Sequence, residues 1–120
     1  MSKILIVDDE IQLIQMLEIR LETNGYEIVT ANDGVEGIEK VKSENPDLII
    51  LDIMMPKMDG YEACKILKND PQYRKIPIIF LSARAQEDNM KIGKEGGAEA
   101  FVKKPFETSD LLTKIKELLK

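Results

Sequence analysis

Four short apolar runs in this sequence each lead into a residue that could take part in phosphoryl-group chemistry. The residues at these four ends are, in chain order, Asp8 with Asp9, then Asp52, Ser82 and Lys104. If the four runs are parallel strands of one sheet, their carboxyl ends share one edge, which is where open α/β sheets place their ligand sites. Three carboxylates, a hydroxyl and an ammonium would then face one crevice.

The three aspartates predict a metal site. Asp8, Asp9 and Asp52 would repel one another strongly if no cation lay among them. Mg2+ prefers hard oxygen ligands and commonly uses only one or two protein carboxylates, so it is the expected ion. Mn2+ could substitute for it. A bound dication would also stabilise the charged oxygens of a phosphoryl group during its transfer.

The remaining residues predict a place for the phosphoryl group itself. Lys104 could pair with it, Ser82 could donate a hydrogen bond to it, and the small Ala83 would leave space for it. Asp52 is the better candidate for the attacking acid, because it stands alone at the end of a fully apolar run. The chain contains no histidine, so the acceptor must be a carboxylate, a hydroxyl or a thiol.

Each of these residues also has a purely structural explanation. Asp8 or Asp9 could cap the first helix, because aspartate is a favoured N-cap residue. Ser82 could cap the fourth helix or a turn, and Lys104 could be a solvated lysine at the sheet edge. Phe101 could be an ordinary core aromatic. The joint placement of the polar residues at four strand ends favours the functional interpretation.

The spacing of the apolar residues predicts strands that alternate with helices, as in βαβ units around a parallel sheet. The first helix carries apolar residues at helical spacing, namely Ile11, Ile14, Leu17 and Leu21. Strands are expected over residues 3–7, 27–31, 48–51, 76–81 and 100–102. Later helices are expected to begin near Gly34, Gly60, Gln86 and Thr108. The fourth helix has no wide apolar stripe, so it is either a switch element or a marginal surface helix.

Composition limits the class of protein. With 120 residues, 43% of them hydrophobic, the chain is expected to form one domain over residues 1–120. A net charge of -5 argues against direct binding to nucleic acid. No apolar run approaches the roughly 18 residues that a membrane span needs, and the first acids come too early for a secretory signal. The single cysteine, Cys64, is expected to pack in a helix face and suits a cytoplasmic location.

Several motifs of this sequence occur in the order and spacing of one known family. They are Asp8-Asp9, the run from Asp52 to Gly60, Ser82-Ala83 and Lys104-Pro105-Phe106. In these motifs the chain resembles the CheY-like receiver domain of two-component response regulators over nearly its whole length. The resemblance implies an α/β flavodoxin-like (βα)5 fold in three layers, with a five-stranded parallel sheet of order 2-1-3-4-5.

The resemblance also implies a role for each metal-site residue. Asp52 would be the phosphoacceptor and Asp9 a direct Mg2+ ligand, while Asp8 would act through water. The backbone carbonyl of Met54 would be a further ligand. Met54 and Arg84 flank the phosphorylation site, and their bulk leads us to expect slow self-dephosphorylation.

A second group of residues would bind and read the phosphoryl group. By the same resemblance Ser82 and Lys104 bind its oxygens, and the Lys104-Pro105 peptide is cis. Ser82 moving toward the phosphate would vacate space for Phe101 to turn inward. That movement would repack the face formed by the fourth helix, the fifth strand and the fifth helix.

The expected function is therefore a signalling switch, which catalyses only its own phosphorylation and slow dephosphorylation. Its donor would be a histidine kinase or a histidine phosphotransfer protein, and its output an unknown partner or a domain outside this chain. It could act as a monomer or as a phosphorylation-dependent homodimer. The alternatives are a haloacid-dehalogenase-like Mg2+-dependent phosphatase, whose Asp-x-Asp pattern is missing here, and a flavin- or nucleotide-binding module, whose glycine motifs are missing.

Overall fold

The described strands and helices follow one another in the expected order. The computed structural model describes residues 1–82 and 97–120. Within them the elements are β1 (Lys3–Val7), α1 (Ile11–Thr23), β2 (Glu27–Ala31), α2 (Gly34–Glu44), β3 (Leu48–Asp52), α3 (Gly60–Lys68), β4 (Ile78–Ser82), β5 (Ala100–Lys103) and α5 (Thr108–Leu118). Strand β4 begins two residues later than expected. The expected fourth helix lies outside the described residues, as do Ala83 and Arg84.

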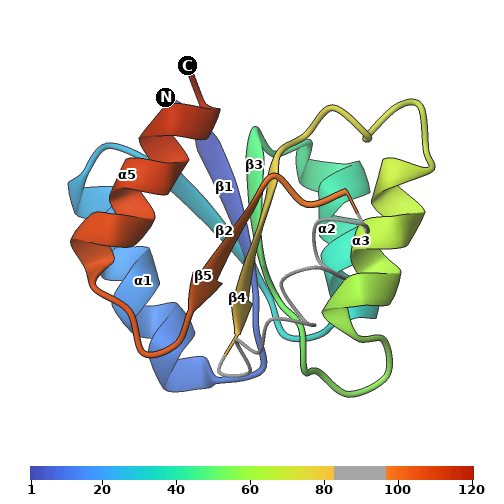
Figure 1. Cartoon of the computed structure of the whole chain (residues 1–120), viewed down its shortest axis with the longest axis horizontal. Coiled ribbons are helices and arrows are strands. Elements are labelled where there is room, and N and C mark those ends of the chain that lie inside the picture. Colours follow the sequence, from blue (N-terminus) through green and yellow to red (C-terminus); the bar gives the residue numbers. More distant parts are fainter. Residues whose placement is uncertain (83–96) are drawn as a thin grey trace.

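The strands form a single parallel sheet in the order β2-β1-β3-β4-β5, which confirms the expected topology. Helices α1 and α5 cover one face of the sheet, and α2 and α3 cover the other (Figure 1). Every residue of β3 and β4 is buried. Strands covered on both faces need apolar side chains at successive positions, which accounts for the unbroken apolar runs in the sequence.

Alternate residues of each strand supply two separate cores. Leu5 and Val7 of β1 pack with α2 and α3, whereas Ile4 and Ile6 pack with α1 and α5. This alternation is the period-2 geometry of a strand. The same division places Cys64, which is buried, in the core beneath α3.

Helix α1 buries a narrower stripe than its sequence predicts. Ile14, Leu17 and Leu21 are buried, but Ile11 is 64% exposed. Two successive steps of three residues carry Ile11 about 120° around the helix from Leu17, so it turns away from the sheet. Ile11 therefore lies on the surface, at the first position of α1.

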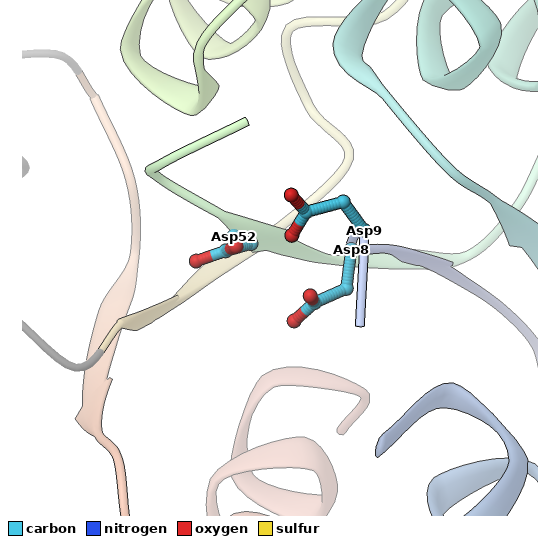
Figure 2. Close-up of side chains that lie close together, drawn as sticks. All are labelled: Asp8, Asp9 and Asp52. Atoms are coloured by element: carbon cyan, nitrogen blue, oxygen red, sulfur yellow. The ribbon is translucent and has the colours of Figure 1, made fainter. Parts of the chain in front are cut away.

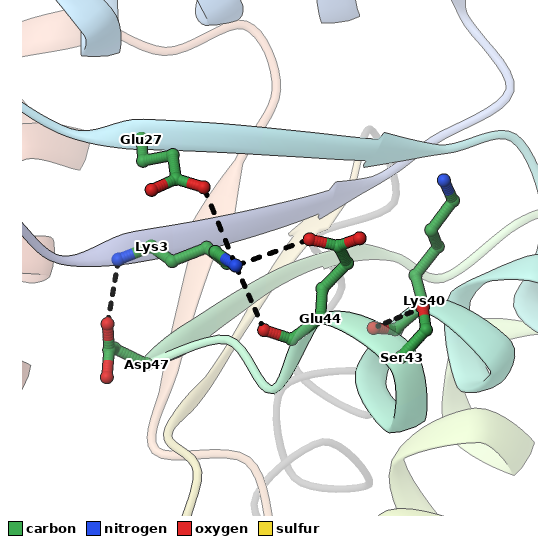
Figure 3. A network of polar contacts seen from close by, with 6 residues as sticks. All are labelled: Lys3, Glu27, Lys40, Ser43, Glu44 and Asp47. Atoms are coloured by element: carbon green, nitrogen blue, oxygen red, sulfur yellow. Dashed lines mark hydrogen bonds and ion pairs between the residues drawn. The ribbon is translucent and has the colours of Figure 1, made fainter.

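Lys3 holds together the segments at the amino-terminal ends of the strands (Figure 3). Its Nζ donates to the backbone oxygen and to Oε1 of Glu44, both at 3.2 Å, and pairs with Glu27 at 3.5 Å. Its backbone N–H donates to Asp47 Oδ2 at 2.7 Å. These contacts join β1, β2, the end of α2 and the start of β3 at the amino-terminal ends of the strands, opposite the predicted site.

Candidate metal and phosphoryl site

The three predicted metal-site aspartates lie together at the carboxyl ends of β1 and β3 (Figure 2). Val7 pairs with Leu51 in neighbouring parallel strands, so Asp8 and Asp52, the next residue of each chain segment, fall side by side. Carboxylate oxygens of Asp8, Asp9 and Asp52 all lie within 4.8 Å of one another. Asp8 and Asp52 are buried and Asp9 is exposed. The clustering predicted from the sequence is confirmed.

The loop after β3 folds tightly against the backbone of Asp52. Lys57 has a φ of 68°, and Met58 N–H donates to the Pro56 carbonyl at 2.8 Å, so the chain makes a γ-turn there. Gly60 N–H donates to the Ile53 carbonyl at 2.8 Å. A Cβ on Gly60 would lie 2.2 Å from the carbonyl oxygen of Asp52. Glycine at position 60 therefore lets α3 begin directly against the strand that carries Asp52.

Lys104 reaches into the acidic cluster from the end of β5. Its Nζ donates to Asp8 Oδ2 at 3.0 Å and to Glu10 Oε1 at 2.9 Å, and lies 3.8 Å from Asp52 Oδ1. Only 12% of the Lys104 side chain is exposed, so the alternative of a solvated edge lysine is wrong. The Lys104-Pro105 peptide is cis, as the resemblance implied. Glu10 was not predicted as part of this site, although it continues the acidic run of Asp8 and Asp9.

The charges of the cluster are only partly balanced. Burial raises the pKa of Asp52 to about 7, and the charge of Asp8 adds to this shift, whereas Lys104 opposes it. Burial also raises the pKa of Asp8, against the hydrogen bonds that it accepts from Glu10 N–H and Lys104. For Lys104 burial lowers the pKa, but the hydrogen bonds to Glu10 and Asp8 outweigh this and raise it.

This donor set suits a hard divalent cation. Asp8, Asp9 and Asp52 each offer a carboxylate oxygen, which is the kind of ligand that Mg2+ prefers. A nearby dication would favour the ionised form of Asp52 and so offset the effect of burial and like charge. The residues present therefore fit Mg2+ at the carboxyl end of the sheet.

The comparison with known families agrees with this geometry. Residues 4–116 match the response regulator receiver domain. The chain belongs to this family. The alkaline phosphatase synthesis transcriptional regulatory protein PhoP of Bacillus subtilis is 42% identical over 119 residues, which cover 99% of this receiver domain and 49% of that protein. A probable transcriptional regulator, ycf27, of Cyanophora paradoxa is 45% identical, with 99% and 48% covered. The receiver domain thus spans about half the length of these curated relatives.

Solved structures resemble the receiver domain along its whole length. Chemotaxis protein CheY4 of Vibrio cholerae is 37% identical with a TM-score of 0.93, and 99% of each chain is covered. Response regulator protein TrrA of Thermotoga maritima, solved in complex with Mg(2+)-BeF, is 36% identical with a TM-score of 0.89, covering 99% of this chain and 100% of that one. Receiver domains are signalling modules that work with histidine kinases, rather than metabolic enzymes. The phosphatase alternative is therefore set aside.

The capping alternative for the two aspartates is wrong. The N-cap of α1 is Glu10, and no side chain caps this helix. Asp8 Oδ1 instead accepts a hydrogen bond from Glu10 N–H at 2.9 Å. Aspartate caps occur elsewhere in the receiver domain, because Asp33 and Asp59 accept from backbone N–H groups at the starts of α2 and α3. The acids after β1 are therefore left for the site.

The structure describes three further predicted site residues, Ser82, Phe101 and Met54. Ser82 is buried at the end of β4, and Phe101 is half-buried against the core beneath α2 and α3. Met54 is 51% exposed just after Asp52. The functions of these residues stay predictions, and Ala83 and Arg84 lie outside the described residues. No described helix is both long enough and apolar enough to cross a membrane.

Proposed function

We propose that this receiver domain takes a phosphoryl group onto Asp52 from the phosphohistidine of a histidine kinase or a histidine phosphotransfer protein. The observation that carries the proposal is the position of the Asp52 carboxylate, which lies between the acids after β1 and the Lys104 ammonium. The chain has no histidine of its own, so the phosphohistidine lies outside residues 1–120. Residues 1–120 act in this as one domain.

Mg2+ would be held by Asp9 directly, by Asp8 through water, by Asp52, and by the backbone carbonyl of Met54. Mn2+ could take its place. Bound there, the cation supplies positive charge to the phosphoryl oxygens during transfer. The Mg(2+)-BeF complex of the relative TrrA supports Mg2+ as the ion of this site.

The residues of the site divide the transfer among them. The ionised carboxylate of Asp52 attacks phosphorus in line, an O–P bond forms, and the P–N bond breaks with its electron pair passing to the imidazole. Positioning and charge stabilisation account for most of the acceleration in such transfers. Lys104 and the Ser82 hydroxyl bind the phosphoryl oxygens.

The switch connects Ser82 with Phe101. Ser82 pairs with Lys103, and Phe101 lies two residues earlier on β5, on the same face of the sheet. Movement of Ser82 toward the phosphoryl group opens space on this face, and Phe101 turns into it. Phosphorylation thereby shifts the population between two packings of the face that includes β5 and α5.

A hollow on the surface of β5 and α5 supports a role for this face in binding a partner. Phe101, Phe106 and the α5 residues Asp110, Thr113 and Glu117 line a hollow of about 610 Å³ there. Its occupant in this proposal is a downstream protein, an output domain outside this chain, or a second receiver domain. An NMR comparison of amide shifts with and without phosphorylation tests the switch, and unchanged shifts along β5 and α5 would contradict it.

Intact-protein mass tests the acceptor directly. The receiver domain is incubated with Mg2+ and acetyl phosphate beside Asp52→Asn and a control, Glu39→Gln, whose glutamate is exposed on α2. One phosphoryl addition that requires Mg2+, persists in the control and is lost in Asp52→Asn supports the proposal. Addition to Asp52→Asn would move the acceptor elsewhere and refute it.

A further inference from the structure

Glu10 holds one side of the Lys104 ammonium. Its Oε1 lies 2.9 Å from Lys104 Nζ, whereas Asp52 Oδ1 lies 3.8 Å away. The Lys104 head is therefore hydrogen-bonded to the acids after β1, and its contact with the acceptor is a longer ion pair. Asp8 is the buried partner of Lys104, and Glu10, whose side chain is 60% exposed, is the outer one.

Glu10 does not stabilise the helix that it begins. It occupies the N-cap of α1, a position where a short polar side chain usually accepts a hydrogen bond from the first turn. The Glu10 side chain makes no such bond and reaches Lys104 instead. Its contact with Lys104 is thus separable from the stability of α1.

We propose that Glu10 is a positioning residue that holds Lys104 in the unphosphorylated state and competes with the phosphoryl group for it. The inference rests on the proposed function, in which Lys104 binds the phosphoryl group. Lys104 Nζ now donates to Asp8 and Glu10, so a phosphoryl group on Asp52 meets an ammonium that these two carboxylates already hold. The contact with Glu10 is the one to be given up, because its exposed carboxylate is compensated by water.

The expected effect is a modest change in the affinity for a phosphoryl analogue. In saturating Mg2+, Glu10→Gln should bind beryllofluoride about two- to fivefold more tightly than the native chain, as befits the loss of one exposed ion pair. The gain should shrink as salt is added, because exposed charges are screened. The control is Glu22→Gln, which changes the net charge equally at an exposed residue near the other end of α1. It should leave the affinity for beryllofluoride unchanged.

A second substitution separates affinity from helix stability. Glu10→Ser supplies a favoured N-cap and also frees Lys104. We expect it to raise the urea midpoint while tightening beryllofluoride binding as much as Glu10→Gln. Tight binding in one variant alone would mean that Glu10 acts by another route, and would overturn the inference.

A double-mutant cycle decides whether Glu10 acts through Lys104 or simply repels anions. Beryllofluoride affinity is measured by NMR titration for Glu10→Gln, Lys104→Met and the double variant. Loss of the Glu10→Gln gain in the Lys104→Met background supports the proposal, whereas an unchanged gain refutes it. If Lys104→Met removes binding altogether, the 15Nζ signal of Lys104 decides. Before beryllofluoride is added, this signal should differ between Glu10→Gln and the native chain, and an identical signal would refute the proposal.

The same titration distinguishes a failure of the proposed function from a failure of the role given to Glu10. Failure of the native chain to bind beryllofluoride with Mg2+ would count against the proposed function itself. Normal binding by the native chain with no effect of Glu10→Gln would remove only the role assigned to Glu10.

Discussion

Replacing Asp52 with asparagine is expected to make the protein more stable when Mg2+ is chelated. Only 5% of Asp52 is exposed, and its carboxylate lies beside Asp8 and Asp9. Asparagine has nearly the same size and no charge, so it removes the repulsion while largely keeping the packing. Asp52, which we assign as the phosphoacceptor, should therefore lower the free energy of unfolding of the protein when no metal is bound.

The raised pKa of Asp52 gives the size and sign of the effect. The folded pKa is about 7 and the ordinary value is 3.8, a difference that corresponds to about 4 kcal/mol. Well below pH 4 the carboxyl is neutral in both states and contributes nothing. As the pH rises, the unfolded chain ionises first and the native protein loses stability, until the full penalty is reached above about pH 7. Burying the new amide takes back about 1 kcal/mol, so we expect a net gain of about 3 kcal/mol near pH 8.

Urea unfolding followed by far-ultraviolet circular dichroism measures the difference. Native chain, Asp52→Asn and Glu39→Gln are compared with EDTA at several pH values, Glu39 being an exposed carboxylate of α2. The advantage of Asp52→Asn should be large near pH 8, small near pH 5 and absent from the control. Mg2+ should narrow it, because the cation binds the native chain more tightly than the variant.

Equal stability of Asp52→Asn and the native chain at every pH would refute the reasoning. It would mean that the three carboxylates are solvated or spread apart in solution, and that the repulsion inferred from their closeness does not exist. An advantage that persisted unchanged at low pH would be equally damaging, because it would have a cause other than charge.

Three further predictions concern the loop after β3 and the far edge of the sheet. Gly60→Ala places a Cβ 2.2 Å from the Asp52 carbonyl oxygen. We therefore expect the free energy of unfolding in urea to fall by about 2 kcal/mol or more, and phosphorylation by acetyl phosphate to be slower. The control Gly25→Ala, whose new Cβ would meet no atom within 4 Å, should leave the phosphorylation rate unchanged. Lys3→Met removes the contacts to Glu44 and Glu27 and should lower the urea midpoint without changing the phosphorylation rate, because Lys3 lies at the opposite edge of the sheet. The phosphorylated native chain should keep its phosphoryl group for minutes or longer by mass spectrometry, and Met54→Ala should shorten that lifetime by admitting water; a native half-life of seconds would contradict the role given to Met54 and Arg84.

The sheet and the acidic cluster could be predicted because they depend on short, regular patterns. The buried strand β3 is apolar at every position up to Asp52, so its place in the middle of a parallel sheet follows from its composition. Parallel strands also bring their carboxyl ends to one edge, whatever the loops between them do. That rule alone brings Asp8 and Asp52 together.

Side-chain directions at the margins of the elements could not be predicted in the same way. Ile11 has the right spacing for the buried stripe of α1 and is nevertheless exposed. Glu10 occupies an N-cap without capping, because a lysine distant in sequence offers it a better partner. Lys57 has a positive φ that no lysine prefers, imposed by the γ-turn of its loop. The Glu10 contact depends on a residue distant in sequence, and the other two features depend on where an element begins or turns, which apolar spacing alone does not fix.

The charges at the sheet edge give the proposed switch both its metal requirement and its route to the surface. Burial and neighbouring acids hold the pKa of Asp52 near 7, so a cation that favours its ionised form also prepares it to attack. Lys104 connects these charges with the sheet, because its backbone N–H donates a hydrogen bond to the Ser82 carbonyl at 2.8 Å. A shift of the Lys104 head toward a phosphoryl group therefore acts at the junction of β4 and β5. Phe101 lies on the second of these strands, where such a shift would alter its packing.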